Sequence, residues 1–412
     1  MTEQVTTTPW VGPDRPVSRG WTTRFTLVWF GIWMAWLVPI QLVLPDQLDR
    51  IDHAHRISDF GWINGGVGVV AIVTLPLFGA LCDRTSSRLG RRRVWVLGGV
   101  VVFVLGLLLS GLQTDWVALG GCWVLASLGN NAMAAGLTAV IADEVPESQR
   151  GMASAAIYGP QAVGILVGLL AVQGLGTMGR FVALALGLLV FSLPFLLGHR
   201  DAPPAATAPP LSVRSVARGM WISPRDHPDF AWAFGGRLLV NLGNAFGTTE
   251  LLFFLRDDLK VPDPDSRLVQ LTLVYLVFTV LATYLGGIWS DRTGRRRVFV
   301  AVASCLQAVA ALLLAALPSW DTAMVGAALL GAGYGAFMSV DQALITAVLP
   351  SAEDRAKDLG LMNIGSVLPQ ALGPLLGGLF ITTLGGYPML FGAAGVITLA
   401  GAAMVYRIRS VR

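Results

Sequence analysis

The sequence predicts an all-α membrane protein with twelve transmembrane helices in two six-helix parallel repeats. Three observations lead to this prediction. Long apolar runs alternate with short charged loops along the whole chain. One charged loop, GALCDRTSSRLGRRR at residues 79–93, returns as GIWSDRTGRRR at residues 287–297. Lys and Arg are concentrated in alternate loops. Because each copy of the loop lies between two apolar runs, both halves have the same layout.

The composition requires most of the surface to face lipid. Of the 412 residues, 54% are hydrophobic and 13% are charged, about half of the roughly 25% charge of a soluble domain. Runs of ~20 apolar residues cross the bilayer core as helices, which satisfy their own backbone polar groups. We expect spans near Phe25–Leu44, Phe60–Leu81, Val94–Leu112, Trp116–Ile141, Met152–Leu175, Phe181–Gly198, Phe230–Leu255, Leu268–Trp289, Val298–Leu317, Thr322–Leu349, Leu359–Leu384 and Tyr387–Tyr406.

The basic residues predict the orientation. With a cytoplasmic N-terminus, 22 of the 29 Lys and Arg fall on the inside and six on the outside, and Arg237 lies within a span. Such an excess is the positive-inside signature. Both termini are therefore expected in the cytoplasm. The use of Arg in preference to Lys favours a bacterial protein in a cell membrane. The basic loops anchor the topology, so no nucleic acid is expected as a partner.

A Pro- and Ala-rich segment divides the chain after six spans. We expect an N-terminal bundle at residues 1–198, a cytoplasmic linker at 199–228 and a C-terminal bundle at 229–412. Asp83 and Asp291 are 208 residues apart, and the segments PQAVGILVG and PQALGPLLGG, at Pro160 and Pro369, are 209 apart. Two matches in the same order at near-equal offsets indicate parallel repeats about an axis normal to the membrane.

The twelve spans, the linker and the repeated loop resemble the major facilitator superfamily over essentially the whole chain. Its loop pattern is Gly-x-x-x-Asp-Arg-x-Gly-Arg-Arg. The resemblance implies that these loops gate the cytoplasmic side, with partners at the inner end of the fourth span. The candidate gating residues are Asp83, Arg84, Gly90, Arg91, Asp143 and Arg150 in the first half and Asp291, Arg292, Gly294 and Arg295 in the second.

A narrower resemblance links the first half to the sucrose and glycoside–proton symporters. It rests on the insertion in DRTSSRLGRRR and on the run NNAMAAGLTAVIAD from Asn130. Those carriers have an acid and an Arg where this chain has Ser127 and Thr138. Ser127, Asn131 and Thr138 share one helix face, so the register fits but the charges are absent. This weakens the case for sugar symport.

Two charges lie deep within later spans. Asp341 is nine residues, ~13 Å of helix, from Pro350 at the inner end of its span. A carboxylate at that depth is a functional candidate by default. Arg237 begins a polar stripe of the seventh span that continues through Asn241, Asn244 and Thr248. We expect Arg237 to pair with Asp341 near the midplane, either for function or as a structural lock between two helices.

Other polar groups are less decisive. Gln41 and Asn131 are expected to offer hydrogen bonds to a solute in the cavity. Glu250 points about 200° away from Thr248 on an ideal helix, so packing or snorkelling explains it as well as coupling does. The motif Gly-Pro-x-x-Gly-Gly marks antiporters of the family in the fifth span, but here it begins at Gly373 in the eleventh. It gives export slight support.

These observations predict a monomeric, proton-coupled transporter of a small organic solute. We favour export of a metabolite or drug-like compound, with proton-coupled glycoside uptake as the alternative. No phosphate-binding loop, metal cluster or catalytic constellation is visible, so neither enzymatic activity nor a cofactor is expected and the drive must be an ion gradient. The rival class is a non-transporting membrane sensor or a membrane-embedded enzyme.

Overall fold

The computed structural model describes residues 16–146, 149–199, 201, 225–293, 296–348 and 355–408. The first bundle consists of α1 (Arg19–Val38), η1 (Pro39–Val43), α2 (Leu44–Ile51), α3 (Arg56–Arg84), α4 (Arg93–Ser110), α5 (Trp116–Glu144), α6 (Arg150–Val172) and α7 (Thr177–Gly198). The second consists of α9 (Pro228–Thr248), α10 (Leu251–Phe253), η3 (Phe254–Asp258), α11 (Pro264–Thr293), α12 (Arg296–Ala316), α13 (Trp320–Val348), α14 (Arg355–Thr383) and α15 (Gly386–Tyr406).

Within the described residues, eleven helical spans are long and apolar enough to cross a membrane. A twelfth is the bent pair Ile364–Gln370 and Leu372–Thr383 of α14, which turns by 40°. Proline causes this bend, because Pro369 and Pro374 lie inside α14 and each removes a backbone donor. The expected all-helical class with twelve spans is therefore confirmed. The expected linker lies mostly outside the described residues, which omit 202–224.

Small residues let the helices approach closely. A Cβ at Gly129 of α5 would lie 2.3 Å from the backbone N of Phe103 in α4. In the second bundle a Cβ at Gly333 of α13 would lie 2.6 Å from the carbonyl oxygen of Ala303 in α12. Small residues at interfaces are how helices pack in lipid, where no hydrophobic effect drives them together.

Two π-helical segments occupy corresponding places in the bundles. The segment η1 (Pro39–Val43) continues α1, and η3 (Phe254–Asp258) follows α9 and α10. The spans that contain them are the longest, 33 and 31 residues. Single π turns inside helices are frequent at functional sites because they re-aim side chains. The sequence pattern does not predict these two segments.

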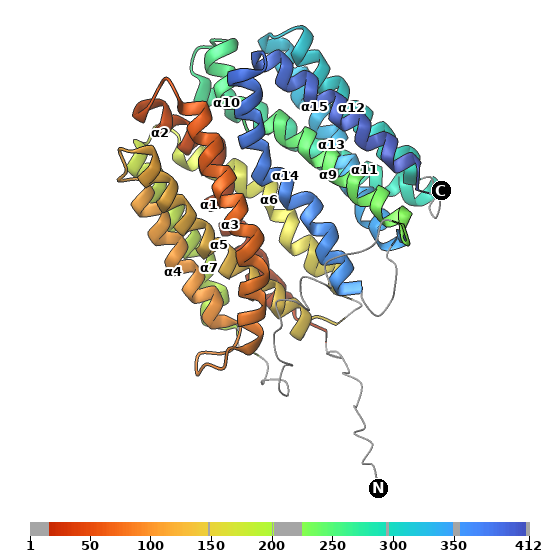
Figure 1. The fold of residues 1–412 in the computed structure, drawn as a ribbon. Coiled ribbons are helices and arrows are strands. Elements are labelled where there is room, and N and C mark those ends of the chain that lie inside the picture. The colour runs from red at the N-terminus through yellow and green to blue at the C-terminus, as the bar shows by residue number, and fades with distance from the viewer. Residues whose placement is uncertain are drawn as a thin grey trace.

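Figure 1 shows the bundles side by side, with α3 and α14 crossing between them. We call the face where α1 begins and α15 ends the termini face, and the opposite one the far face. Glycines bring α3 and α14 into contact near the far face: a Cβ at Gly61 would lie 3.0 Å from the carbonyl oxygen of Pro374, and one at Gly378 would lie 3.1 Å from that of Ile57. The bundles diverge toward the termini face (Figure 1).

Candidate functional site

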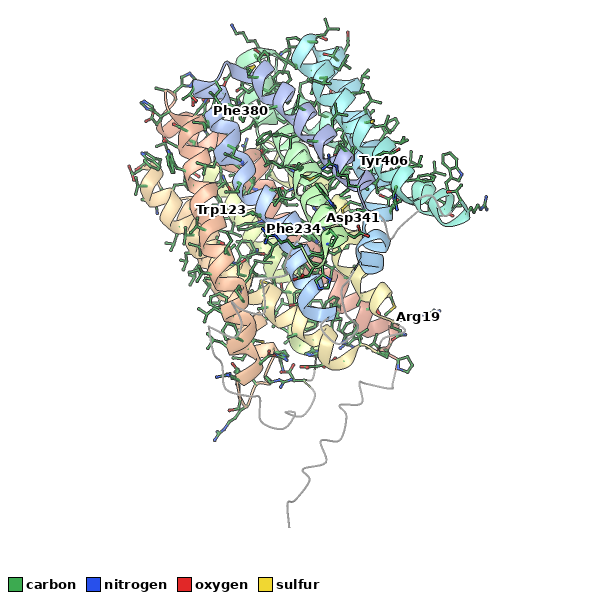
Figure 2. All side chains as sticks on the ribbon, turned by 45° about the vertical axis from the view of Figure 1, so that its right-hand side comes forward. Arg19, Trp123, Phe234, Asp341, Phe380 and Tyr406 are labelled. Atoms are coloured by element: carbon green, nitrogen blue, oxygen red, sulfur yellow. The ribbon has the colours of Figure 1, made fainter. Side chains whose placement is uncertain are left out.

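An ion pair lies inside the second bundle. Nη1 of Arg237 on α9 donates to Oδ2 of Asp341 on α13, and the two side chains are only 4% and 2% exposed. The Arg237 Nε donates to the Ser366 hydroxyl of α14 at 2.7 Å. The structure thus brings together the two charges that the sequence singled out, and adds Ser366, which the sequence gave no reason to select. Figure 2 shows Asp341 among the helices of this bundle.

The polar stripe of α9 extends from this pair toward the far face. The Asn241 amide donates to the carbonyl oxygen of Arg237 at 2.8 Å, and the Asn244 amide donates to the Tyr275 hydroxyl at 3.5 Å. Both Asn side chains are buried. Asn241 therefore serves its own helix, whereas Asn244 connects α9 to α11.

A pocket of about 60 Å³ lies in the far-face half of the second bundle, where η1 and α6 of the first bundle also line it. Its polar lining is small: Thr248, Thr272, Tyr275 and, from η1 of the first bundle, Gln41. The remaining lining consists of Ile165, Gly247, Leu251, Leu268, Leu271, Leu276, Ala310, Ala311, Leu314, Ala323, Gly326, Ala327, Leu330 and Phe391. Such a surface suits an apolar solute held by a few hydrogen bonds.

Two tyrosines connect the pocket to the ion pair. Tyr275 lines the pocket and stacks on Tyr334, with ring centroids 6.4 Å apart. Tyr334 lies seven residues before Asp341, so both occupy one face of α13. Through Tyr334, the pocket-lining Tyr275 therefore packs beside the face of α13 that carries Asp341.

The two remaining cavity candidates differ in outcome. Gln41 lines the pocket, and its buried Oε1 has no hydrogen-bond partner among the described residues. Asn131 lies elsewhere: its amide donates to Thr74 of α3 at 2.9 Å and approaches the hydroxyl of Ser127 at 3.5 Å. Asn131 is 4% exposed. In this conformation the Asn131 amide takes part in the packing of α5 on α3, and Asn131 does not line the pocket, so its bond to a solute stays a prediction.

Ion pairs join the bundles at the far face. Arg56 of α3 bonds Asp257 of η3. The Arg256 Nη2 lies 2.8 Å from Oδ1 of Asp46, and the Arg180 Nη2 lies 3.0 Å from Oδ2 of Asp265. We call these three pairs the far gate. Each one crosses from the first bundle to the second, so together they hold the far face closed in this conformation.

The first copy of the repeated loop forms a charge cluster at the termini face. Asp143 at the end of α5 accepts from Arg91 at 2.7 Å and from Arg92 at 2.8 Å. Arg92 also pairs with Asp83 at 2.6 Å, and Arg84 is exposed. Burial alone would lower the pKa of Arg92, but its bonds to Asp143, Cys82 and Asp83 raise it above its usual value. The cluster fastens α3, α4 and α5 to one another.

Position 90 requires glycine because it packs against Asp201, an acid that the sequence pattern does not indicate. Its φ of +106° disfavours any side chain, and a Cβ there would lie 2.2 Å from Oδ2 of Asp201. That carboxylate accepts from the backbone N–H groups of Arg92 at 2.7 Å and Arg93 at 3.2 Å, at the start of α4. Burial raises the pKa of Asp201, but bonds from His199 and these N–H groups lower it overall. Asp201, three residues after the end of α7, therefore holds the loop.

The remaining gating candidates are Arg150 and the residues of the second copy of the repeated loop. Arg150 begins α6, but its side chain lies outside the described residues, as does that of Asp291. Arg292 is exposed at the end of α11. Gly294 and Arg295 lie outside the described residues altogether.

Comparisons with known proteins agree on one family. A sequence model of the Major Facilitator Superfamily matches residues 25–264 and 254–412. The MFS transporter asaE of Aspergillus flavus is 25% identical over 417 residues, covering 97% of this chain and 89% of that protein. Citrate exporter 1 of Aspergillus niger is 33% identical over 167 residues, which is 40% of this chain and 31% of that protein.

A third relative covers less of the chain. The rice (Oryza sativa subsp. japonica) sucrose transport protein SUT1 is 28% identical over 100 residues, 24% of this chain. The match spans only 18% of the rice protein's length.

Solved structures share the fold over nearly the whole chain. The human organic anion transporter MFSD10 superposes with a TM-score of 0.70 at 16% identity, covering 95% of this chain and all of that one. A POT family transporter in complex with a thioalcohol-conjugated peptide superposes with a TM-score of 0.74 at 13% identity, covering 94% and 95%. At these identities the likeness establishes the fold alone.

Proposed function

The chain belongs to the Major Facilitator Superfamily, and from this premise we propose that it is a proton-coupled secondary transporter that exports a small, largely apolar organic solute. The buried Arg237–Asp341 pair is the observation that carries the proposal. A carboxylate in a membrane interior is costly unless a cation accompanies it. When Arg237 moves away, a proton is the natural replacement, and that exchange loads and unloads the carrier.

The lining of the pocket supports the proposed class of solute. Its lining offers four polar side chains among many apolar ones. A glycoside carries many hydroxyl groups, each of which loses hydration on entry and needs a partner in the protein. A metabolite or drug-like compound with an apolar body and one or two polar groups fits this lining better. Asp341 alternatively supplies the counter-charge for a cationic solute.

The relatives are compatible with transport in either direction. One matching segment belongs to a citrate exporter and another to a sucrose transport protein. We favour export because Ser127 is buried against Asn131 and carries no charge, and because the pocket is apolar. Proton-coupled glycoside uptake remains the second candidate, favoured by the sequence match to the sucrose transporters.

We further propose that the protein is a monomer in a bacterial cell membrane, with the termini face in the cytoplasm. The far gate then closes the external side, and this conformation faces inward. The loop cluster around Asp143 lies on the cytoplasmic side, where it supplies the charges that latch the bundles when that side closes. A cysteine placed in the exposed turn at Ala54 should therefore react with a membrane-impermeant thiol reagent added from outside whole cells.

A paired assay tests the transport function. The purified full chain is reconstituted in liposomes under an imposed pH gradient, and a panel of labelled amphipathic compounds and glycosides is followed. We expect gradient-dependent movement of an amphipathic compound against its concentration and none in the presence of a protonophore. Movement of glycosides alone would establish the second candidate. No driven movement of any compound would favour a sensor or an embedded enzyme.

The loop cluster yields a kinetic prediction. Asp143→Asn should slow exchange about tenfold, since the loss of one charge-assisted hydrogen bond costs roughly 1.5–3 kcal/mol. Asp83→Asn should slow it less, because Asp83 makes a single pair and its side chain is 56% exposed against 21% for Asp143. Solute affinity, measured by equilibrium binding, should stay near that of the parent for both variants. A large loss of binding with normal exchange would contradict a gating role.

A further inference from the structure

Glu250 lies at the far-face end of the second bundle, where the seventh span breaks between α9 and α10. Its residue is 0% exposed, and neither Oε1 nor Oε2 has a hydrogen-bond partner among the described residues. Two other buried acids do have partners: Asp341 binds Arg237, and Asp46 binds arginines of both bundles. Among the described residues, Glu250 is therefore a buried carboxyl group without a counter-charge.

The helix that covers Glu250, α14, also packs against α3 of the first bundle near the far face. A Cβ at Gly377 of α14 would lie 3.1 Å from Cγ and 3.2 Å from Oε1 of Glu250. At the next residue, Gly378, an added Cβ would lie 3.1 Å from the carbonyl oxygen of Ile57 on α3. The Gly-Gly pair thus makes two contacts at once: it encloses the carboxyl group on one side and meets the first bundle on the other. Parting α14 from α3 would loosen this enclosure.

The charged groups near Glu250 bind one another. On α15, the Tyr387 hydroxyl donates to Asp257 of η3 at 3.1 Å. The same Asp257 is bonded by Arg56 of α3. Asp59, also on α3, is a second buried acid, with Oδ2 unbonded. None of these groups supplies a counter-charge to Glu250, but Asp59 is a rival for any response of this region to pH.

We propose that Glu250 is a proton-binding site that controls the far gate: the gate closes over the neutral acid and opens when the acid is ionised. An ionised carboxylate that is buried without a partner is penalised by several kcal/mol, whereas the neutral acid is tolerated. Hydration in the open conformation removes that penalty. Because opening releases the proton to the far side, the gate is open more often as pH rises. This inference rests on the proposed transporter function, but it assigns the site to gate control and leaves solute coupling to Asp341.

The experiment measures the far gate without any solute. In the full chain, reconstituted in nanodiscs, Cys82, Cys122 and Cys305 are replaced by Ser, and spin labels are attached through Ala54→Cys and Pro262→Cys. Both positions are exposed on the far face, one in each bundle. Double electron–electron resonance then gives the open fraction as a function of pH. A single ionising group changes the ratio of open to closed molecules by up to about tenfold per pH unit.

The expected pattern separates Glu250 from its neighbours. The parent should open with rising pH, Glu250→Gln should stay closed throughout, and Asp258→Asn, which removes an exposed carboxylate of η3, should behave as the parent. A parent that does not respond to pH, or a response that survives in Glu250→Gln, would overturn the proposal. A response lost in Asp59→Asn but kept in Glu250→Gln would overturn it in favour of Asp59.

A second readout covers the case in which Glu250→Gln does not fold. Glu250→Met removes the polar group while keeping the volume, and its thermal unfolding should lack the fall in Tm that the parent shows toward alkaline pH. Equal alkaline losses in parent and variant would contradict the proposal. Neither readout uses a solute, so failure of the liposome assay would reject the transport function without deciding the role of Glu250, and the reverse also holds.

Discussion

Asp341→Asn is expected to abolish solute accumulation driven by a pH gradient while sparing solute exchange. Asn keeps the shape of the side chain and can still accept from Arg237, but it cannot bind and release a proton. In liposomes the variant should bring labelled solute only to the same concentration on both sides. Counterflow, in which unlabelled solute drives the entry of labelled solute, needs no net proton movement and should persist at a rate within about tenfold of the parent, the cost of roughly one hydrogen bond.

The matched control is Asp115→Asn. Asp115 is exposed and caps α5 by accepting from the N–H of Ala118 at 2.9 Å, and Asn caps a helix equally well. This variant should accumulate solute as the parent does. If Asp341→Asn also concentrates solute across the same gradient, Asp341 does not carry the proton, and its pair with Arg237 is a structural lock between α9 and α13.

The buried ion pair could be predicted from the sequence because depth along a helix can be counted. Each residue advances the helix by ~1.5 Å. Arg237 follows the start of its span and Asp341 precedes the end of its span, and both of these helix ends were expected on the inner side. The two residues were therefore expected at similar depths. An isolated charge at that depth needs a partner. The neighbours of the pair could not be found in this way, because Ser366 and Tyr334 are ordinary residues of a membrane helix until packing places them beside a charge.

Periodicity was less informative about which neighbour a polar face meets. It placed Ser127 and Asn131 on one face correctly, but that face turns toward Thr74 of α3 and away from the pocket. For Glu250 the helix angle was uninformative because the helix breaks there. Its angle relative to Thr248 assumed an unbroken helix, whereas residues 249 and 250 form a turn between α9 and α10.

Contacts across long sequence separations left no local signal at all. Asp201 follows the sixth span in a Pro- and Ala-rich segment, yet its carboxylate lies against Gly90, more than a hundred residues earlier. The far gate is a partial exception. Its acids and arginines lie at helix ends that the predicted spans place in loops on one side of the membrane. A closing contact there was therefore open to inference, although the individual pairs were not.

Arg237→Met is expected to destabilise the second bundle by about 3–5 kcal/mol, because it leaves Asp341 buried without a counter-charge. Met retains an unbranched apolar stem, although it is two atoms shorter than Arg, and adds no polar group. The main changes are therefore the lost charge and the lost hydrogen bond to Ser366. The double variant Arg237→Met with Asp341→Leu should recover most of this loss, since two apolar residues need no partners in the interior. Thermal or denaturant unfolding of the parent, both single variants and the double variant in detergent gives the coupling energy as a double-mutant cycle. Full additivity of the two single effects would show that the charges do not stabilise each other, and would remove the physical basis for treating them as one site.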